Sequence, residues 1–291
     1  MGNTCNAKYW IAVENGGARC SLCPHRCLIA ENSSGICGVR TNICGELTAA
    51  SYGAVSSMAL DPIEKKPLYM FHPGKRVLSI GGFGCNLRCR FCQNHEISTV
   101  RCDAAPVPLA NCMAPQDVAA IAVQTVPDGN IGVAYTYNEP LIGYEFLYDC
   151  ALLVRKEGLR NIIVTNGYIN KEPLEALLPL IDAMNIDLKG FTESFYKKVG
   201  GTLEPVKEAI RLAAGRCHVE VTTLVIPGEN EEDIEPIAQW LSSLDPCIPL
   251  HLSRFFPRHK YSDRAPTPRE TIIRLSEIAK RYLKNVFAGN M

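Results

Sequence analysis

The sequence lacks an excess of charge of either sign. It contains 30 lysine and arginine residues and 30 aspartate and glutamate residues, so its formal net charge is zero. This balance does not indicate a nucleic acid or an anionic membrane surface as a partner, and we expect neither. The N-terminal stretch MGNTCNAK also lacks the basic segment and apolar run of a signal peptide, and no later apolar run is long enough to cross a bilayer. We therefore expect a soluble, cytoplasmic protein.

Cysteine, in contrast, is frequent, with 14 residues in a chain of 291. Without a secretion signal, this number favours metal ligation in a reducing compartment over a disulfide framework. The chain length suits one large α/β barrel or two ordinary domains, and the 47% share of hydrophobic residues is ample for a core.

Three of the cysteines form a motif in the stretch from Gly84 to Asn94. Cys85, Cys89 and Cys92 are separated by three and then two residues, and Phe91 precedes the last of them. Three thiolates can hold three irons of a 4Fe-4S cubane and leave the fourth iron without a protein ligand, where chemistry can take place. The same cysteines could instead be ordinary buried thiols, or zinc ligands with a fourth donor elsewhere.

This spacing, with an aromatic residue before the last cysteine, resembles the signature of the radical S-adenosylmethionine (SAM) superfamily. The resemblance implies that a 4Fe-4S cluster on the three cysteines binds SAM at its open iron. One electron then cleaves SAM to methionine and a 5'-deoxyadenosyl radical, which abstracts hydrogen from a substrate. A reductant such as flavodoxin or ferredoxin is implied as a partner. Because such a cluster is exposed to its cosubstrate, we also expect an anaerobic or oxygen-poor host.

Strand and helix patterns alternate after about Val77. Apolar, β-branched runs predict strands at residues 77–80, 131–135, 162–164, 184–187, 219–226 and 248–252. Amphipathic stretches predict helices at residues 115–126, 141–157, 172–178, 204–214, 233–244 and 267–283. Val286 could begin a seventh strand.

Repeated alternation of this kind predicts a parallel sheet with crossover helices. Six units are fewer than a full eight-stranded barrel requires. The superfamily resemblance implies an α/β fold of the partial TIM barrel type, (β/α)6. We therefore expect a small cysteine-rich N-terminal segment over residues 1–76 and the barrel over residues 77–291.

Polar side chains follow the ends of most predicted strands, where parallel α/β folds place their sites. Each group also has a structural explanation. Asn138 and Glu139 could cap a helix, Thr165 to Gly167 could be only a turn, and Asp187 and Lys189 could be a surface ion pair.

The superfamily resemblance implies a SAM-binding role for these groups. Tyr137, Asn138 and Glu139 occupy the position of the Gly-Gly-Glu motif that contacts the SAM amino group. Other segments look like those of glycyl-radical-enzyme activases that line the rest of SAM. The resemblance gives as cofactor-binding residues Phe91, Tyr137, Asn138, Glu139, Thr165, Asn166, Asp187, Lys189, Val225 and His251, and as catalytic residues Lys189, His251 and Arg254.

The N-terminal cysteines form a second group, Cys20, Cys23, Cys27 and Cys37. Four thiolates suit tetrahedral zinc, and they equally suit an auxiliary iron-sulfur cluster. Buried free thiols are the alternative to either metal. A segment with so little apolar periodicity would need a metal in order to fold.

A wider resemblance, carried by segments such as CSLCPHRC, DPIEKKPL, TYNEP and HLSRF, is to the radical SAM enzymes of the AmmeMemoRadiSam system. These are often labelled pyruvate formate-lyase activating enzyme homologues. The resemblance implies a reaction class and leaves the small-molecule or protein substrate unidentified.

Two alternative functions remain open. One is a glycyl-radical-enzyme activase, although residues 221–224 lack the arginine that activases commonly carry there, and Tyr137 and Asn138 replace two glycines. The other is a non-catalytic iron-sulfur electron carrier. For the enzyme, Glu64, Lys65 and Arg254 are expected to be accessible to substrate.

Overall fold

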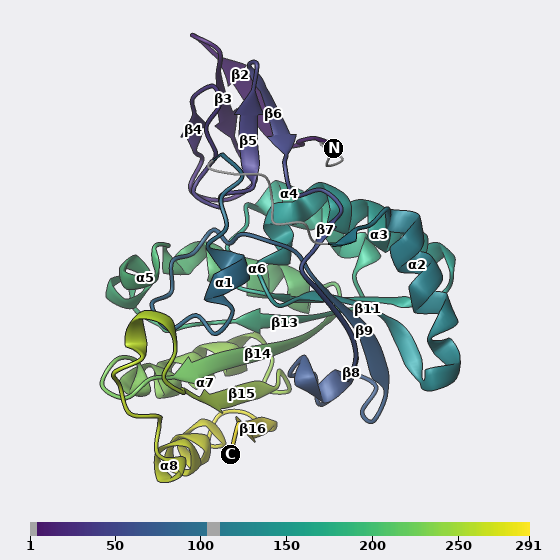
Figure 1. The fold of residues 1–291 in the computed structure, drawn as a ribbon. Helices are drawn as coiled ribbons and strands as arrows, with labels where there is room; N and C mark the ends of the chain where they lie inside the picture. Colours follow the sequence, from purple (N-terminus) through teal and green to yellow (C-terminus); the bar gives the residue numbers. More distant parts are fainter. Residues whose placement is uncertain (1–4, 104–110) are drawn as a thin grey trace.

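The computed structural model describes residues 5–103 and 111–291, so Met1 to Thr4 of the expected N-terminal segment lie outside the described residues. Within these ranges, eight strands form one large curved sheet in the order β16-β15-β14-β13-β12-β11-β9-β8 (Figure 1). Neighbouring strands from β9 to β16 are parallel, whereas β8 runs antiparallel to β9. The strands are β8 Ser57–Pro62, β9 Arg76–Gly81, β11 Asn130–Thr136, β12 Arg160–Thr165, β13 Ala183–Asp187, β14 His218–Val225, β15 Leu250–Arg254 and β16 Val286–Gly289.

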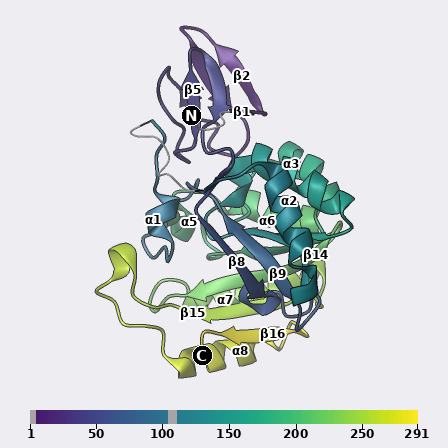
Figure 2. The same cartoon turned by 45° about the vertical axis from the view of Figure 1, so that its right-hand side comes forward.

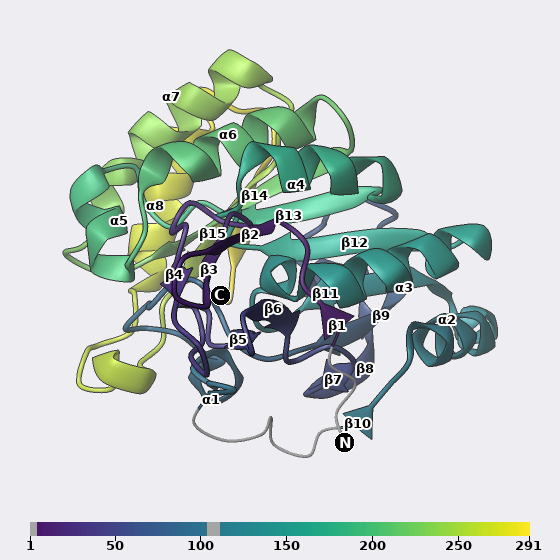
Figure 3. The same cartoon turned by 90° about the horizontal axis from the view of Figure 1, so that it is seen from above.

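Helices connect the parallel strands and cover the outer face of the sheet (Figures 1 and 3). In α6, for example, Val206, Ile210 and Ala213 are spaced four and three residues apart and are fully buried, so one apolar stripe faces the sheet. The result is the predicted α/β partial barrel. The helices are α1 His95–Ser98, α2 Pro115–Gln124, α3 Tyr144–Lys156, α4 Lys171–Leu177, α5 Glu193–Val199, α6 Leu203–Ala214, α7 Ile234–Leu244 and α8 Arg269–Ala279.

The predicted strands and helices are all present, with two differences of detail. The chain at residues 141–157 begins as the 3-10 turn η3, Pro140–Gly143, and continues as α3. The helices α1 and α5 were not predicted. With only four residues, α1 is too short for an amphipathic pattern.

The sheet extends beyond six strands at both edges. The possible strand at Val286 is β16, which pairs with β15. At the other edge, β8 lies before residue 77, in chain expected to belong to the cysteine-rich segment (Figure 2). The division of the chain at residue 77 stays a prediction, and the main sheet takes in this earlier strand.

Two small antiparallel sheets stand together at one end of the molecule, beyond the main sheet (Figure 1). One contains β1 Cys5–Asn6, β6 Glu46–Ala49 and β5 Arg40–Ile43, and the other contains β2 Trp10–Val13, β3 Gly17–Cys20 and β4 Leu28–Ile29. A further short pair joins β7 Ala54–Val55 to β10 Asn111–Cys112. Arg40 of β5 forms a buried ion pair of 3.1 Å with Glu145 of α3, which ties these sheets to the barrel.

The interior of the barrel is polar at the amino ends of the strands. Glu220 of β14 is completely buried and accepts hydrogen bonds from the backbone amides of Tyr69 and Met70 at 3.0 and 2.8 Å. Asn185 of β13 donates to the carbonyl of Pro67 at 2.8 Å. The segment after the 3-10 turn η1, Ile63–Lys65, therefore closes this end of the barrel and leaves the other end for a site.

Among the described residues, no helix has both the length and the apolar composition needed to cross a membrane.

Candidate active site

A large cavity, of about 1250 Å³ including space open to solvent, lies at the carboxyl ends of the parallel strands. Most of the residues predicted for the site line it together, although they come from four separate segments. These residues are Cys85, Cys89, Phe91, Cys92, Tyr137, Asn138, Glu139, Thr165, Asn166, Asp187 and Lys189. The convergence follows from the fold, because parallel strands present all their carboxyl ends at one edge of the sheet.

The loop that follows β9 carries Cys85, Cys89 and Cys92 along one side of this cavity. All three thiols are half-buried. Burial raises the pKa of Cys89 to about 11 and raises that of Cys85 further. Such thiols lose their protons readily only to a metal, so the donors fit an iron-sulfur cluster.

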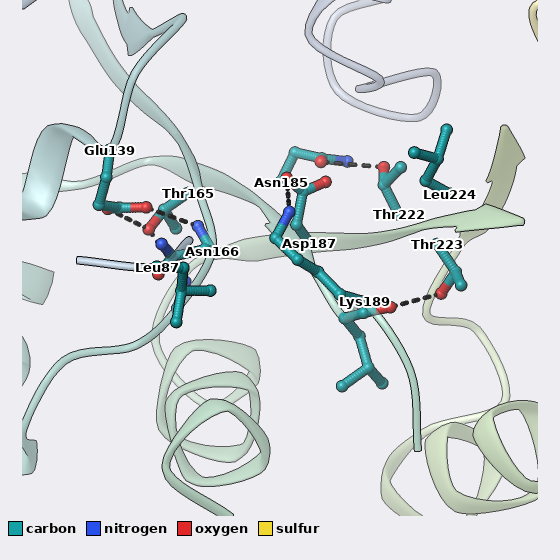
Figure 4. A network of polar contacts seen from close by, with 12 residues as sticks. Leu87, Glu139, Thr165, Asn166, Asn185, Asp187, Lys189, Thr222, Thr223 and Leu224 are labelled. Carbon is teal, nitrogen blue, oxygen red and sulfur yellow. Dashed lines mark hydrogen bonds and ion pairs between the residues drawn. The ribbon is translucent and has the colours of Figure 1, made fainter. Parts of the chain in front are cut away.

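Glu139 lies at the centre of a buried hydrogen-bond network (Figure 4). Its Oε1 accepts from the Thr165 hydroxyl at 2.6 Å and from the Leu141 amide at 3.0 Å, and its Oε2 accepts from the Asn166 amide at 2.8 Å. The bond to Leu141 caps η3, so the capping role considered for Glu139 is real. Burial nevertheless raises its pKa to about 7, and this carboxylate faces the cavity. It is suited to binding a cationic group, which would stabilise its charge.

Asn166 connects Glu139 to the cysteine loop. Its side-chain amide donates to Asn86 Oδ1 at 2.9 Å and to Cys85 Sγ at 3.6 Å. The following residue, Gly167, has φ +67°, so the turn considered for this segment is present, and a side chain there would be strained. The turn holds Asn166 in place beside the first cysteine.

Asp187 and Lys189 form an ion pair of 3.0 Å on the cavity wall at the end of β13. The Lys189 side chain is only 16% exposed. Burial alone would lower the pKa of Lys189, but the nearby Asp187 and Cys89 raise it, so the side chain is cationic. A buried cation beside the thiols can bind a carboxylate.

Tyr137 projects from the end of β11 toward the antiparallel strand β8. Its hydroxyl donates to Asp61 Oδ2 at 2.9 Å, and Lys66 Nζ lies 4.6 Å from its ring centroid and 2.9 Å from the same carboxylate oxygen. Burial alone would raise the pKa of Asp61, but the hydrogen bonds from Lys66, Tyr137 and Lys65 hold it well below its usual range. Lys65 and Lys66 both line the cavity.

Three predicted residues do not line the cavity: Val225, His251 and Arg254. His251 faces the barrel interior one layer below Ser253, where its Nε2 lies 2.6 Å from Glu220. Val225 is completely buried on the outer face of β14. Arg254 points away from the interior and donates to the Thr267 carbonyl at 2.8 Å. Glu64, also expected near substrate, instead accepts from the Gly74 amide at 2.6 Å.

The cavity also contains residues that the sequence prediction missed, among them Thr222, Leu224 and Ser253. A signal for them exists. Side chains alternate between the two faces of a strand, so Thr222 and Leu224 share a face with Glu220, as Ser253 does with His251. The predicted residues Val225 and Arg254 are the neighbours of Leu224 and Ser253 and lie on the opposite face of each strand.

The second group of cysteines, Cys20, Cys23, Cys27 and Cys37, lines a separate and more enclosed cavity. Burial raises the pKa of Cys23 to about 12 and also raises that of Cys37.

The model of the radical SAM superfamily matches residues 79–241, which is more than half of the sequence. This chain therefore belongs to the radical SAM superfamily. Members of this superfamily are enzymes, and membership implies a 4Fe-4S cluster and SAM as cofactors.

The chain is also similar to individual relatives and solved structures. The chain is 43% identical to "Uncharacterized protein MJ0808" of Methanocaldococcus jannaschii, over 98% of this chain and 85% of that protein. It is 26% identical to "Putative glycyl-radical enzyme activating enzyme MJ1227" of the same organism, over 74% of this chain and 89% of that protein. Among solved structures, QueE from Escherichia coli has 15% identity and a TM-score of 0.52, over 83% of this chain and 95% of that one, and this likeness shows the fold alone.

Proposed function

We propose that this chain is a radical SAM enzyme that holds a 4Fe-4S cluster on Cys85, Cys89 and Cys92 and binds SAM in the adjoining cavity. The observation that carries the proposal is that the three thiols, the Glu139 carboxylate and the Lys189 ammonium face one cavity at the carboxyl edge of the sheet. When bound, the cluster supplies the electron that cleaves SAM to methionine and a 5'-deoxyadenosyl radical, which abstracts hydrogen from a substrate not yet identified.

The polar residues of the cavity match the two charged ends of an amino acid. Glu139 is a buried carboxylate fixed by three donors, so it can receive an ammonium group without reorganising. Lys189 is a buried cation next to Cys89 and can receive a carboxylate. Asp187, already paired with Lys189, keeps that ammonium from turning away. The methionyl part of SAM would therefore lie between β11 and β13.

Apolar and hydroxyl groups complete the other walls. Phe91 is 6% exposed and Leu224 lies on the cavity wall, and both offer apolar contact to a purine or ribose. Lys65 at one edge and Asn290 at the other also border the cavity, on the side that solvent reaches. We assign the substrate to this side, with Lys65 as the cationic residue that meets it.

The test is anaerobic. Protein reconstituted with iron and sulfide is reduced with dithionite and mixed with SAM, and 5'-deoxyadenosine is quantified against a Cys92→Ala variant. We expect release that depends on Cys92. A full, reducible cluster that yields no 5'-deoxyadenosine, with or without lysate metabolites, would contradict the proposal and favour the electron carrier.

A glycyl-radical-enzyme activase is the second candidate. The relative named as a putative glycyl-radical enzyme activating enzyme favours it, as does 26% identity over 52% of this chain to the pyruvate formate-lyase 1-activating enzyme of Escherichia coli. The absence of an arginine at residues 221–224 speaks against it. A radical signal at a backbone glycine of an added glycyl radical enzyme would support the activase.

The electron-carrier alternative is less well supported. A carrier needs a cluster near the surface and has no use for a cavity of this size lined by Glu139, Asn166 and Lys189. We propose instead that a carrier such as flavodoxin or ferredoxin is the partner that reduces this protein.

A further inference from the structure

Four cysteines line the enclosed cavity among the N-terminal strands. Cys20 ends β3, Cys23 and Cys27 lie in the turn between β3 and β4, and Cys37 precedes β5. The remaining lining is mostly apolar, with Leu22, Ile29 and Ile142. Cys20 and Cys37 are 6% and 7% exposed. Four thiols that line one buried space indicate a ligand that bonds to sulfur.

The spacing of the thiols favours a cluster over a single ion. Four sulfurs on one tetrahedral zinc stand about 3.8 Å apart, given a bond of about 2.3 Å. In the part of the chain that is described, no three cysteine, histidine or acidic side chains lie close enough together to hold one ion. The same is true of Cys85, Cys89 and Cys92, which belong to the cluster motif of this superfamily. A cubane binds each thiolate at a different corner and so accommodates thiols that stand too far apart for one ion.

A buried cation with an unused donor borders the same cavity. Arg40 is 2% exposed, and its terminal nitrogen is 3.1 Å from Glu145. Within the described residues, its Nε makes no hydrogen bond. An orphaned donor beside Cys20 and Cys37 costs free energy unless an acceptor fills the space. Thiolate or sulfide sulfur of a negatively charged cluster is such an acceptor.

We propose that Cys20, Cys23, Cys27 and Cys37 hold a second 4Fe-4S cluster. With four protein thiolates, every iron of this cluster has a protein ligand, so it can carry an electron and cannot bind SAM.

The second site adjoins the loop of the first. His25 Nε2 lies 2.7 Å from the carbonyl of Asn86, which directly follows Cys85 in the chain. Asn86 is also linked to Asn166, which donates to Cys85 Sγ. Two residues thus separate the two groups of thiols. On the condition that the proposed function is right, the second cluster accepts one electron from a reduced flavodoxin or ferredoxin and passes it to the first.

The experiment measures metal content in the whole chain after anaerobic reconstitution with iron and sulfide. We expect about eight irons per chain in the wild type and about four in the Cys85→Ala, Cys89→Ala, Cys92→Ala variant. The Cys23→Ser, Cys37→Ser variant should also hold about four. Cys44→Ser, at an exposed cysteine of the same small sheets, is the matched control and should keep the full complement.

Spectroscopy gives a second measurement on the triple alanine variant, which leaves the N-terminal cysteines intact. After reduction, its cluster should give an electron paramagnetic resonance signal that SAM does not change, because no iron is open. About one zinc and no iron in this variant would overturn the inference in favour of a zinc site. If the variant holds neither iron nor zinc, the inference is overturned in favour of free thiols.

These outcomes are independent of the proposed function. If the wild type does not cleave SAM but the triple variant still binds iron, only the proposed function is contradicted. If the Cys23→Ser, Cys37→Ser variant does not fold, the iron count and spectrum of the triple variant still decide.

Discussion

The hydroxyl of Tyr137 donates to Asp61 Oδ2 at 2.9 Å and so links the end of β11 to β8, two strands away in the same sheet. Tyr137 has φ +71°, a left-handed conformation that costs a residue with a side chain about 1 to 3 kcal/mol. The superfamily resemblance places it at the first glycine of the Gly-Gly-Glu motif, where glycine would adopt this conformation freely. The bond to Asp61 and the ammonium of Lys66 over its ring offset part of that cost.

We expect Tyr137→Phe to lower the free energy of unfolding by about 1 kcal/mol, because it removes this hydrogen bond and retains the strained backbone. The measurement is urea denaturation of Tyr137→Phe, Asp61→Asn and the double variant. The two substitutions should be less than additive by about the same amount. Full additivity would mean that the two side chains do not stabilise each other.

The close approach of Tyr137 to β9 gives a second prediction. A Cβ added at Gly81 would lie 2.8 Å from Tyr137 Cδ2 and 2.9 Å from Ser56 Oγ, so we expect Gly81→Ala to destabilise the protein by about 1 to 3 kcal/mol. The neighbouring Gly82 is the matched control, because a Cβ there would meet nothing nearer than 3.6 Å. Equal unfolding midpoints for the two alanine variants would contradict this account.

The raised pKa of Glu139 makes stability depend on pH. Burial raises the pKa from 4.5 to about 7, so folding binds a proton in this range, and the folded state loses stability as pH rises from about 4.5 through 7. We expect this group to contribute a loss of about 3 kcal/mol in the metal-free chain. Urea denaturation at pH 5 and pH 8 should show that the difference in unfolding free energy between the two pH values shrinks in Glu139→Gln. The same difference should stay unchanged in Glu46→Gln, a substitution at an exposed position of β6.

A fourth prediction separates the two residues that the superfamily resemblance assigned to SAM and to catalysis, Lys189 and His251. Lys189 lines the cavity, so Lys189→Met should weaken SAM binding by about tenfold or more, the value of one charge-assisted hydrogen bond. His251 lies below the cavity against Glu220, so His251→Gln should leave SAM affinity nearly unchanged and lower stability by about 1 to 3 kcal/mol.

Titration calorimetry of the reconstituted protein with SAM, together with thermal unfolding of the same samples, checks this pair. A large loss of affinity in His251→Gln, with unfolding unchanged, would restore the role that the resemblance gave this histidine.

The sequence predicted the parallel strands well, because each is an apolar run of strand length between amphipathic helices. It did not predict β8, since Ser57–Pro62 contains an aspartate and a proline and has no adjacent helix. That strand is held by its pairing with β9 and by the contacts of Asp61, which local patterns do not report. Its proline is tolerated because β8 is an edge strand.

For the site, the sequence located the ends of the strands but not the direction in which each side chain points. The cysteine motif came from its spacing, and Glu139 came from its place after a predicted strand and from the superfamily resemblance. Both lie on one cavity. Val225 and Arg254 lie one residue away from the cavity-lining Leu224 and Ser253, and a shift of one residue along a strand changes the face completely. The contacts of Asn166 with Asn86 and Cys85 join residues about 80 positions apart and have no sequence signature.

The segment that closes the barrel is attached by its backbone. Met70 donates its amide to Glu220 while its side chain is 51% exposed. Evolution can therefore vary the side chain at this position, polar or apolar, at little cost to the fold. Proline is the exception, because it alone removes the amide on which the attachment depends.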